Sequence, residues 1–95
     1  MKYRVKFKCY WYNTGAADNH HYDNYEDFDT LEEAKAFKER VDEQLEMKQK
    51  RDRNKITYDE YYKWKKTFQL IEIENGFIEG YGKIVKYYPE KEEEL

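Results

Sequence analysis

Strict alternation of residue type near the start of the chain constrains the fold more than any other feature. The odd positions are apolar or aromatic: Tyr3, Val5, Phe7, Cys9 and Trp11. The even positions are basic and then aromatic: Lys2, Arg4, Lys6, Lys8, Tyr10 and Tyr12. Successive side chains of a strand point to opposite faces, so the pattern predicts a strand over residues 2–12 with one buried and one solvated face. Cys9 is then a small core residue.

A second pattern predicts a helix over residues 30–52. Thr30 and Glu33 have the spacing of a capping box. The following apolar residues recur at helical spacing: Leu31, Ala34, Phe37, Val41 and Leu45. Acidic residues gather in the first turn and basic residues in the last, which suits the helix dipole at both ends.

The region after residue 56 is less clear. Thr57 and Glu60 repeat the capping-box spacing, which favours a short helix over residues 57–66. A strand that begins near residue 62 is the alternative, and the pattern does not separate the two.

From residue 68 the pattern is extended. Asn75-Gly76 is then a strong hairpin signal, with a return strand over residues 77–88. Gly80 and Gly82 indicate a bulge or a strong twist in that strand. A two-residue turn would place two glutamates opposite each other, so the hairpin register stays open.

These elements predict a single α+β domain over residues 1–95. The expected architecture is a two-layer β-α-β-β fold, in which one long helix packs on one face of a three-stranded antiparallel sheet. Residues 13–29 are expected to form an acidic loop, and residues 90–95 an acidic tail. Long loops in small domains are often functional.

The composition is very polar for a folded domain. Charged residues make up 41% of the chain and the mean hydropathy is -1.31, yet 11 residues are tyrosine. Aromatic side chains must therefore supply much of the core, and tyrosine is also frequent on binding surfaces.

The cellular location follows from what the sequence lacks. A single cysteine excludes an internal disulfide and fits a reducing compartment. The basic start is not followed by an apolar run, and no stretch approaches the ~20 apolar residues of a membrane span. We therefore expect a cytoplasmic protein with no membrane partner.

Catalytic motifs are missing from the sequence. The chain contains no serine, and its four glycines form no phosphate-binding loop. His20 and His21 stand near acidic residues, but their spacing matches no zinc signature, and an exposed polar loop is the simpler interpretation. We expect a non-enzymatic protein without a cofactor or metal, although the sequence leaves a metal role for these histidines open.

Two surfaces are candidates for binding. The first is a patch in the acidic loop made of Tyr22, Asp23, Tyr25 and Asp27. Aromatic anchors within negative charge suit a basic groove of a partner protein, including one that normally holds nucleic acid.

The second candidate is the basic face of the first strand: Lys2, Arg4, Lys6, Lys8, Tyr10 and Tyr12. Cations beside aromatic rings on a sheet suit single-stranded nucleic acid. Lysines that protect an edge strand are an alternative explanation. The net charge of -3 and the lack of a recognised RNA-binding motif weigh against nucleic acid.

In composition the chain resembles small proteins of phages and mobile elements of low-GC bacteria. The segment Phe28-Asp29-Thr30-Leu31-Glu32-Glu33-Ala34 is similar to a helix start common in such proteins. In size and composition the chain is similar to anti-CRISPR and other anti-defence inhibitors. The resemblance implies a non-enzymatic inhibitor that binds a host protein, such as a nucleic-acid-processing nuclease complex. It carries over no functional residue, and it leaves a monomer or a homodimer open.

Overall fold

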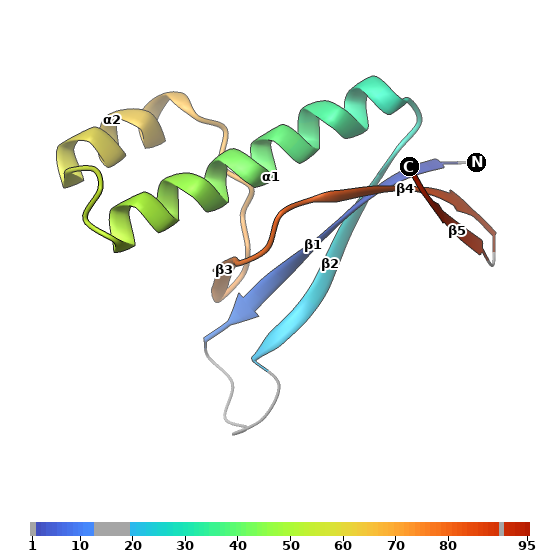
Figure 1. Ribbon diagram of the computed structural model, residues 1–95, viewed down its shortest axis with the longest axis horizontal. Helices are drawn as coiled ribbons and strands as arrows, with labels where there is room; N and C mark the ends of the chain where they lie inside the picture. Colours follow the sequence, from blue (N-terminus) through green and yellow to red (C-terminus); the bar gives the residue numbers. More distant parts are fainter. Residues whose placement is uncertain (1, 13–19, 90) are drawn as a thin grey trace.

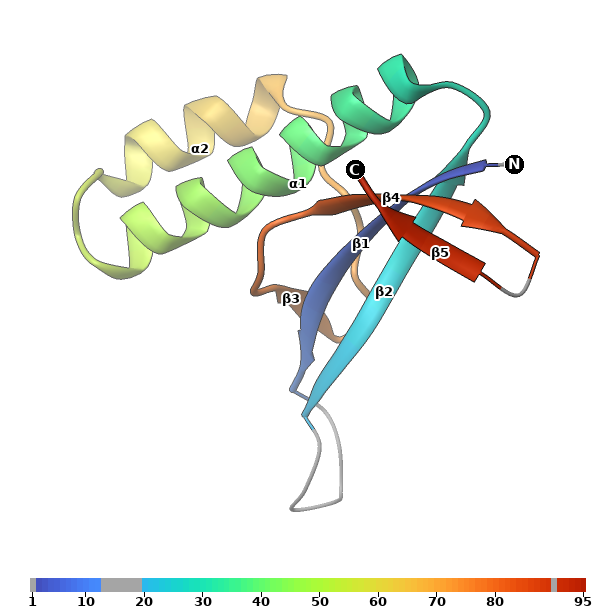
Figure 2. The same ribbon diagram turned by 45° about the vertical axis from the view of Figure 1, so that its right-hand side comes forward.

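The computed structural model describes residues 2–12, 20–89 and 91–95 (Figure 1). In chain order the elements are β1 (Lys2–Trp11), β2 (His21–Phe28), α1 (Leu31–Asp52), α2 (Tyr58–Thr67), β3 (Gly76–Ile78), β4 (Lys83–Tyr88) and β5 (Lys91–Glu94). Figures 1 and 2 show α1 lying across one face of the sheet and α2 running back beside α1.

β1 is the central strand of a five-stranded antiparallel sheet. It pairs with β2 on one side and with β4 and then β3 on the other. β5 pairs with the outer edge of β4, which gives the order β2-β1-β4-β5. The prediction of an α+β fold with an antiparallel sheet is confirmed. The expected three strands and single long helix are corrected to five strands and two helices within the described residues.

The core lies between β1 and α1, as the two sequence patterns predicted. The buried residues of this cluster are Val5, Phe7, Cys9, Ala34, Phe37, Val41, Leu45 and Ile78. The rings of Phe7 and Phe37 meet with their centroids 5.8 Å apart. Thr30 caps α1 by accepting a hydrogen bond from the Glu33 backbone nitrogen at 3.2 Å. The predicted strand and long helix are therefore confirmed.

α2 settles the open choice for residues 57–66 in favour of a helix. Thr57 and Glu60 form the complete capping box. The indole nitrogen of Trp64 donates to Glu43 of α1 at 2.7 Å, and the guanidinium of Arg51 lies 4.6 Å from the ring centroid of Tyr61. α2 is thus held to α1 by polar and aromatic contacts, and none of its residues is buried.

The predicted hairpin at Asn75-Gly76 is wrong. Residues 68–73 form no strand and instead run along α1, where Arg40 and Gln44 donate hydrogen bonds to the carbonyls of Gln69 and Ile71. Gly76 pairs with Trp11 of β1. Asn75 does adopt a positive φ of 53°, but Gly76 does not. The glycine is needed for a different reason, since a Cβ there would lie 2.0 Å from the Tyr10 carbonyl oxygen.

The return strand is interrupted rather than continuous. β3 and β4 both pair with β1, and residues 79–82 separate them. The Gly82 backbone nitrogen donates to Asp42 of α1 at 2.8 Å, which ties this break to the helix. The irregularity expected at Gly80 and Gly82 is thus confirmed, while the single strand over residues 77–88 is not.

The acidic loop and the acidic tail both contain strands. Residues 13–19 of the predicted loop lie outside the described residues, and β2 occupies His21–Phe28. β2 escaped prediction because aspartate and asparagine are poor strand formers, and cross-strand contacts with β1 compensate for them. In the tail, β5 is exposed and acidic as expected, but it is paired with β4.

In the described parts of the chain, neither helix combines the length and the apolar composition that crossing a bilayer requires.

Candidate functional site

The outer face of the sheet, turned away from α1, carries the predicted basic residues of β1 and most of the predicted acidic patch. In the register of β1 and β2, Arg4 lies opposite Asp27, Lys6 opposite Tyr25 and Lys8 opposite Asp23. Residues directly opposite in an antiparallel pair share a face. The predicted basic surface and most of the predicted acidic patch are therefore one mixed surface.

Arg4 is the most constrained residue of this outer face. Its guanidinium donates to both carboxylate oxygens of Asp27, at 2.7 and 3.0 Å, and lies 3.5 Å from Glu92. The rings of Tyr25 and Tyr87 have their centroids 3.8 and 3.9 Å from its central carbon. The hydrogen bond from Arg4 holds the pKa of Asp27 below its usual range. These groups hold the guanidinium in place and leave it poorly disposed to bind a phosphate.

Two lysines of β1 are also paired. Lys2 lies 3.0 Å from Asp29, and Lys6 lies 3.0 Å from Glu92 of β5. Lys8 is exposed, with Asp23 as its cross-strand neighbour. The positive charge of this strand is thus largely balanced by β2 and β5, which the sequence could not show because both segments were expected to be unpaired.

Tyr10 and Tyr12 belong to an aromatic cluster at the far end of β1. The Tyr10 ring stacks with His20 and with Phe77, at centroid distances of 5.5 and 5.1 Å. Tyr12 is 56% exposed and lies 6.4 Å from Phe77. Tyr12 therefore keeps area available for contact, and nucleic-acid binding by this strand stays a prediction.

The predicted protein-binding patch is divided by the alternation of β2. Asp23, Tyr25 and Asp27 share the outer face, but Tyr22 lies opposite Cys9 and so belongs to the face that carries α1. The four residues were grouped on the expectation of a loop. Because side chains alternate along a strand, Tyr22 points to the face opposite Asp23, Tyr25 and Asp27.

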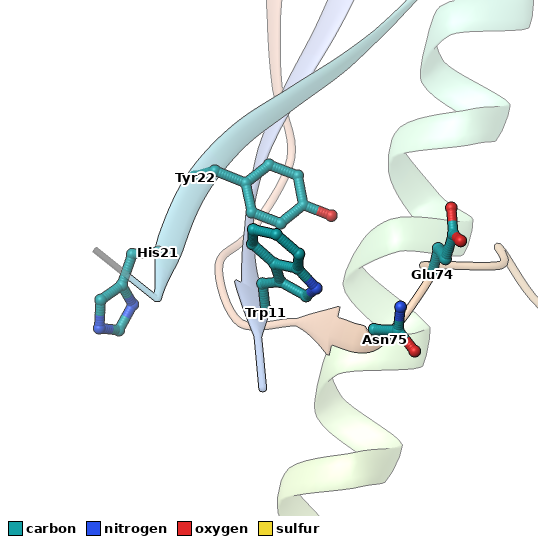
Figure 3. A pocket seen from close by; sticks show the side chains of 5 residues that line it. All are labelled: Trp11, His21, Tyr22, Glu74 and Asn75. Carbon is teal, nitrogen blue, oxygen red and sulfur yellow. The ribbon is translucent and has the colours of Figure 1, made fainter. Parts of the chain in front are cut away.

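Tyr22 instead joins Trp11 in an open depression at the end of the sheet. The depression has a volume of about 810 Å³, and its described lining is Trp11, His21, Tyr22, Glu74 and Asn75. Figure 3 shows the two aromatic side chains with their polar edges turned toward Glu74 and Asn75, and His21 pointing away. We call this feature the aromatic depression.

Local backbone geometry explains why Trp11 is not covered. Its cross-strand neighbour on β3 is Gly76, which has no side chain to place over the indole. Leu45 is the last buried residue of α1. Trp11 is therefore 43% exposed although the alternation of β1 predicted it to be in the core. Sequence reasoning missed Trp11 and Glu74, and only the β1–β3 pairing would have indicated them.

The aromatic depression combines hydrogen-bond donors with a carboxylate. Burial raises the pKa of Tyr22, and the negative charge of Glu74 adds to the effect. The hydroxyl therefore stays protonated and can donate at neutral pH. Glu79 lies 2.5 Å from His21, whose side chain points away from the depression, so Glu74 is the carboxylate of the described lining. The arrangement can hold a cation against aromatic rings.

The remaining candidates for chemistry are the thiol of Cys9 and the two adjacent histidines. Burial raises the pKa of the Cys9 thiol, which disfavours the reactive thiolate. His20 Nδ1 lies 3.2 Å from the Trp11 carbonyl. Within residues 2–12, 20–89 and 91–95, no three histidine, cysteine or acidic side chains are grouped so as to hold a metal ion.

Fold and site together define an α+β sheet protein with an aromatic depression whose described lining includes the carboxylate of Glu74. No protein-family model matches the chain, and neither a curated protein nor a solved structure matches it.

Proposed function

We propose that this is a non-enzymatic binding protein that docks onto a partner protein through the aromatic depression. The observation that carries the proposal is the pair of exposed aromatic side chains, Trp11 and Tyr22, on one side of the sheet, with exposed fractions of 43% and 39%. Tryptophan and tyrosine dominate binding energy at protein interfaces, especially where they line a pocket.

The chemistry of the depression favours a basic side chain of the partner. A lysine or arginine inserted there would contact the ring of Trp11 and approach the carboxylate of Glu74. A cation–π contact of this kind contributes about 0.5–2 kcal/mol, more as the site is desolvated. The net charge of -3 would also assist the approach of a basic partner surface.

The wider proposal follows the compositional resemblance to phage and mobile-element proteins. A basic groove that normally holds nucleic acid is a suitable target for such a protein, and nuclease complexes present grooves of this kind. We therefore propose an inhibitor of a host defence nuclease complex, of the anti-CRISPR type, that acts in the cytoplasm.

The experiment is a pull-down from host-cell lysate with four versions of the protein. Glu74→Lys reverses a charge in the depression, and Glu72→Lys makes the same change on an exposed residue of the same segment. Trp11→Ala removes the aromatic anchor. The proposal predicts that wild type and Glu72→Lys capture the same protein, and that Glu74→Lys and Trp11→Ala lose it.

Equal capture by all four versions would contradict the site, and so would the absence of any protein captured by the wild type. A circular dichroism spectrum of each variant checks that the fold is retained. Glu74→Lys keeps the test valid even if Trp11→Ala is unstable.

A further inference from the structure

A groove between α1, α2 and β3 has a chemistry that the proposed function does not use. Its volume is about 360 Å³, within the range typical of ligand sites. Three cationic side chains line it, Lys48, Arg51 and Lys65, together with the rings of Tyr12, Tyr61 and Phe77. None of its described lining residues is a carboxylate. We call it the cationic groove.

Two of the cations are held in place by aromatic rings. The ammonium of Lys48 lies 4.0 Å from the centroid of Phe77, and the guanidinium of Arg51 lies 4.6 Å from that of Tyr61. Contacts of this kind reduce the side-chain freedom that a ligand would otherwise have to freeze. The cationic groove is therefore partly organised before any ligand arrives.

One nearby carboxylate opposes this charge. Asp52 lies 2.6 Å from Lys48 and 3.2 Å from Arg51. The hydrogen bond from Lys48 holds the pKa of Asp52 below its usual range, so the carboxylate is ionised at neutral pH. One carboxylate against three cations leaves an excess of two positive charges in the cationic groove. The outer face of β1 differs, because carboxylates of β2 and β5 accompany most of its cations.

Further cations lie on both helices. Lys50, Arg53 and Lys55 line a second, smaller depression together with Glu46, on the side of α1 opposite Lys48 and Arg51. Lys63 and Lys66 are exposed on α2. A negatively charged chain that leaves the groove over α2 would therefore meet Lys66, the residue after Lys65, whereas a free small anion would use only the groove.

We propose that the cationic groove binds one nucleotide unit of a single-stranded nucleic acid. The phosphate would lie near Lys48, Arg51 and Lys65, and the base would stack on the exposed ring of Tyr12. Positively charged grooves with aromatic stacking surfaces are the usual means of binding single strands without sequence preference. The site differs from the β1 face that the sequence indicated, and shares only Tyr12 with it.

The test is fluorescence anisotropy of a labelled oligothymidine, titrated with the whole protein at low salt and then at rising salt. Lys48→Gln/Lys65→Gln removes two cations from the groove. Lys2→Gln/Lys6→Gln removes two from the β1 face and is the matched control, because it changes the net charge equally. Both pairs of lysines are on the surface, so both variants are expected to fold.

The expected result is binding that weakens with salt, with a slope of about -0.7 for the one phosphate held in the groove, and a steeper slope where the rest of the strand meets further cations. The groove variant should bind at least about tenfold more weakly at low salt, with a slope smaller in magnitude by about 0.7. Tyr12→Ala should also weaken binding about tenfold through lost stacking. The control variant should bind within about twofold of the wild type, because its lysines lie outside the groove.

Three outcomes would overturn the proposal. They are no binding at low salt, equal loss in the groove and control variants, and binding of thymidine monophosphate as tight as that of the oligonucleotide. The last would assign the groove to a free nucleotide. None of these results bears on the aromatic depression, so the two proposals fail separately.

Discussion

Replacing Gly76 with alanine tests how β3 is joined to β1. The new Cβ would lie 2.0 Å from the Tyr10 carbonyl oxygen and 3.0 Å from its carbon. Ordinary contacts between carbon and oxygen begin near ~3.3 Å. β3 must therefore move away from β1 by more than about 1 Å, which would break the 2.9 Å hydrogen bond from the Tyr12 nitrogen to the Asn75 carbonyl.

The expected loss follows from what moves with Gly76. Two or three backbone hydrogen bonds contribute about 1 kcal/mol each. Ile78, at the other end of β3, is 2% exposed and would lose part of its burial. Together these effects predict a fall of about 2–4 kcal/mol in the free energy of unfolding. For a domain of this size that is a large fraction of the total stability.

Urea unfolding followed by circular dichroism measures this loss, with Gly80→Ala as the matched control. A Cβ at Gly80 would lie 3.2 Å from the Cβ of Lys8, a side-chain atom, and Gly80 has no positive φ. The control should change the free energy of unfolding by less than about 1 kcal/mol. A loss below about 0.5 kcal/mol for Gly76→Ala, or equal losses for both, would refute the close approach of β3 to β1.

Two further predictions concern the core and the outer face. Leu45→Ala should lower the free energy of unfolding by about 2–5 kcal/mol in the same urea assay. Leu95→Ala, at an exposed residue, should leave it nearly unchanged. Similar losses for both variants would contradict the placement of Leu45 in the core. Folding lowers the pKa of Asp27, because the carboxylate is paired with Arg4. The pair therefore stabilises the fold fully above the unfolded-state pKa of about 3.9. This stabilisation is lost as the pH falls through the lower pKa of the folded state. The stability gap between wild type and Asp27→Asn should therefore be about 1.5 kcal/mol at pH 7 and shrink below about pH 4, and a gap that is constant from pH 7 to pH 2 would contradict the pairing.

The sequence was sufficient where the local pattern and the tertiary packing agree. Residues 2–12 alternate because one face of β1 packs on α1, and Thr30 begins α1 because its side chain satisfies a backbone nitrogen that the helix leaves unpaired. In both elements the same residues that define the pattern make the contacts. Local reasoning therefore predicted the strand, the helix and most of the core.

The sequence misled where distant contacts decide the structure. β2 is as polar as a loop, and it is a strand because β1 offers it a partner along its whole length. Asn75-Gly76 has the local signature of a hairpin, yet the glycine is required by the Tyr10 carbonyl of a strand far away in the sequence. Both contacts join segments that are far apart in the sequence, so the pattern within one segment does not predict them.

The candidate site depended on the same distant contacts. Tyr22 was predicted as a binding residue, but with neighbours that the strand places on the opposite face. Trp11 was assigned to the core, and its exposure arises from the glycine that faces it on β3. The aromatic depression therefore could not be assembled before the β1–β3 pairing was known.

Photo-crosslinking at Tyr22 tests the proposed docking most directly. A photoreactive phenylalanine analogue replaces Tyr22, and in a control protein it replaces Tyr62 on α2, which is 53% exposed and lies outside the aromatic depression. After irradiation in host-cell lysate, mass spectrometry identifies the crosslinked protein. Docking through the aromatic depression predicts a single protein crosslinked from position 22 and not from position 62. Crosslinking to the same proteins from both positions, or to none from position 22, would contradict it.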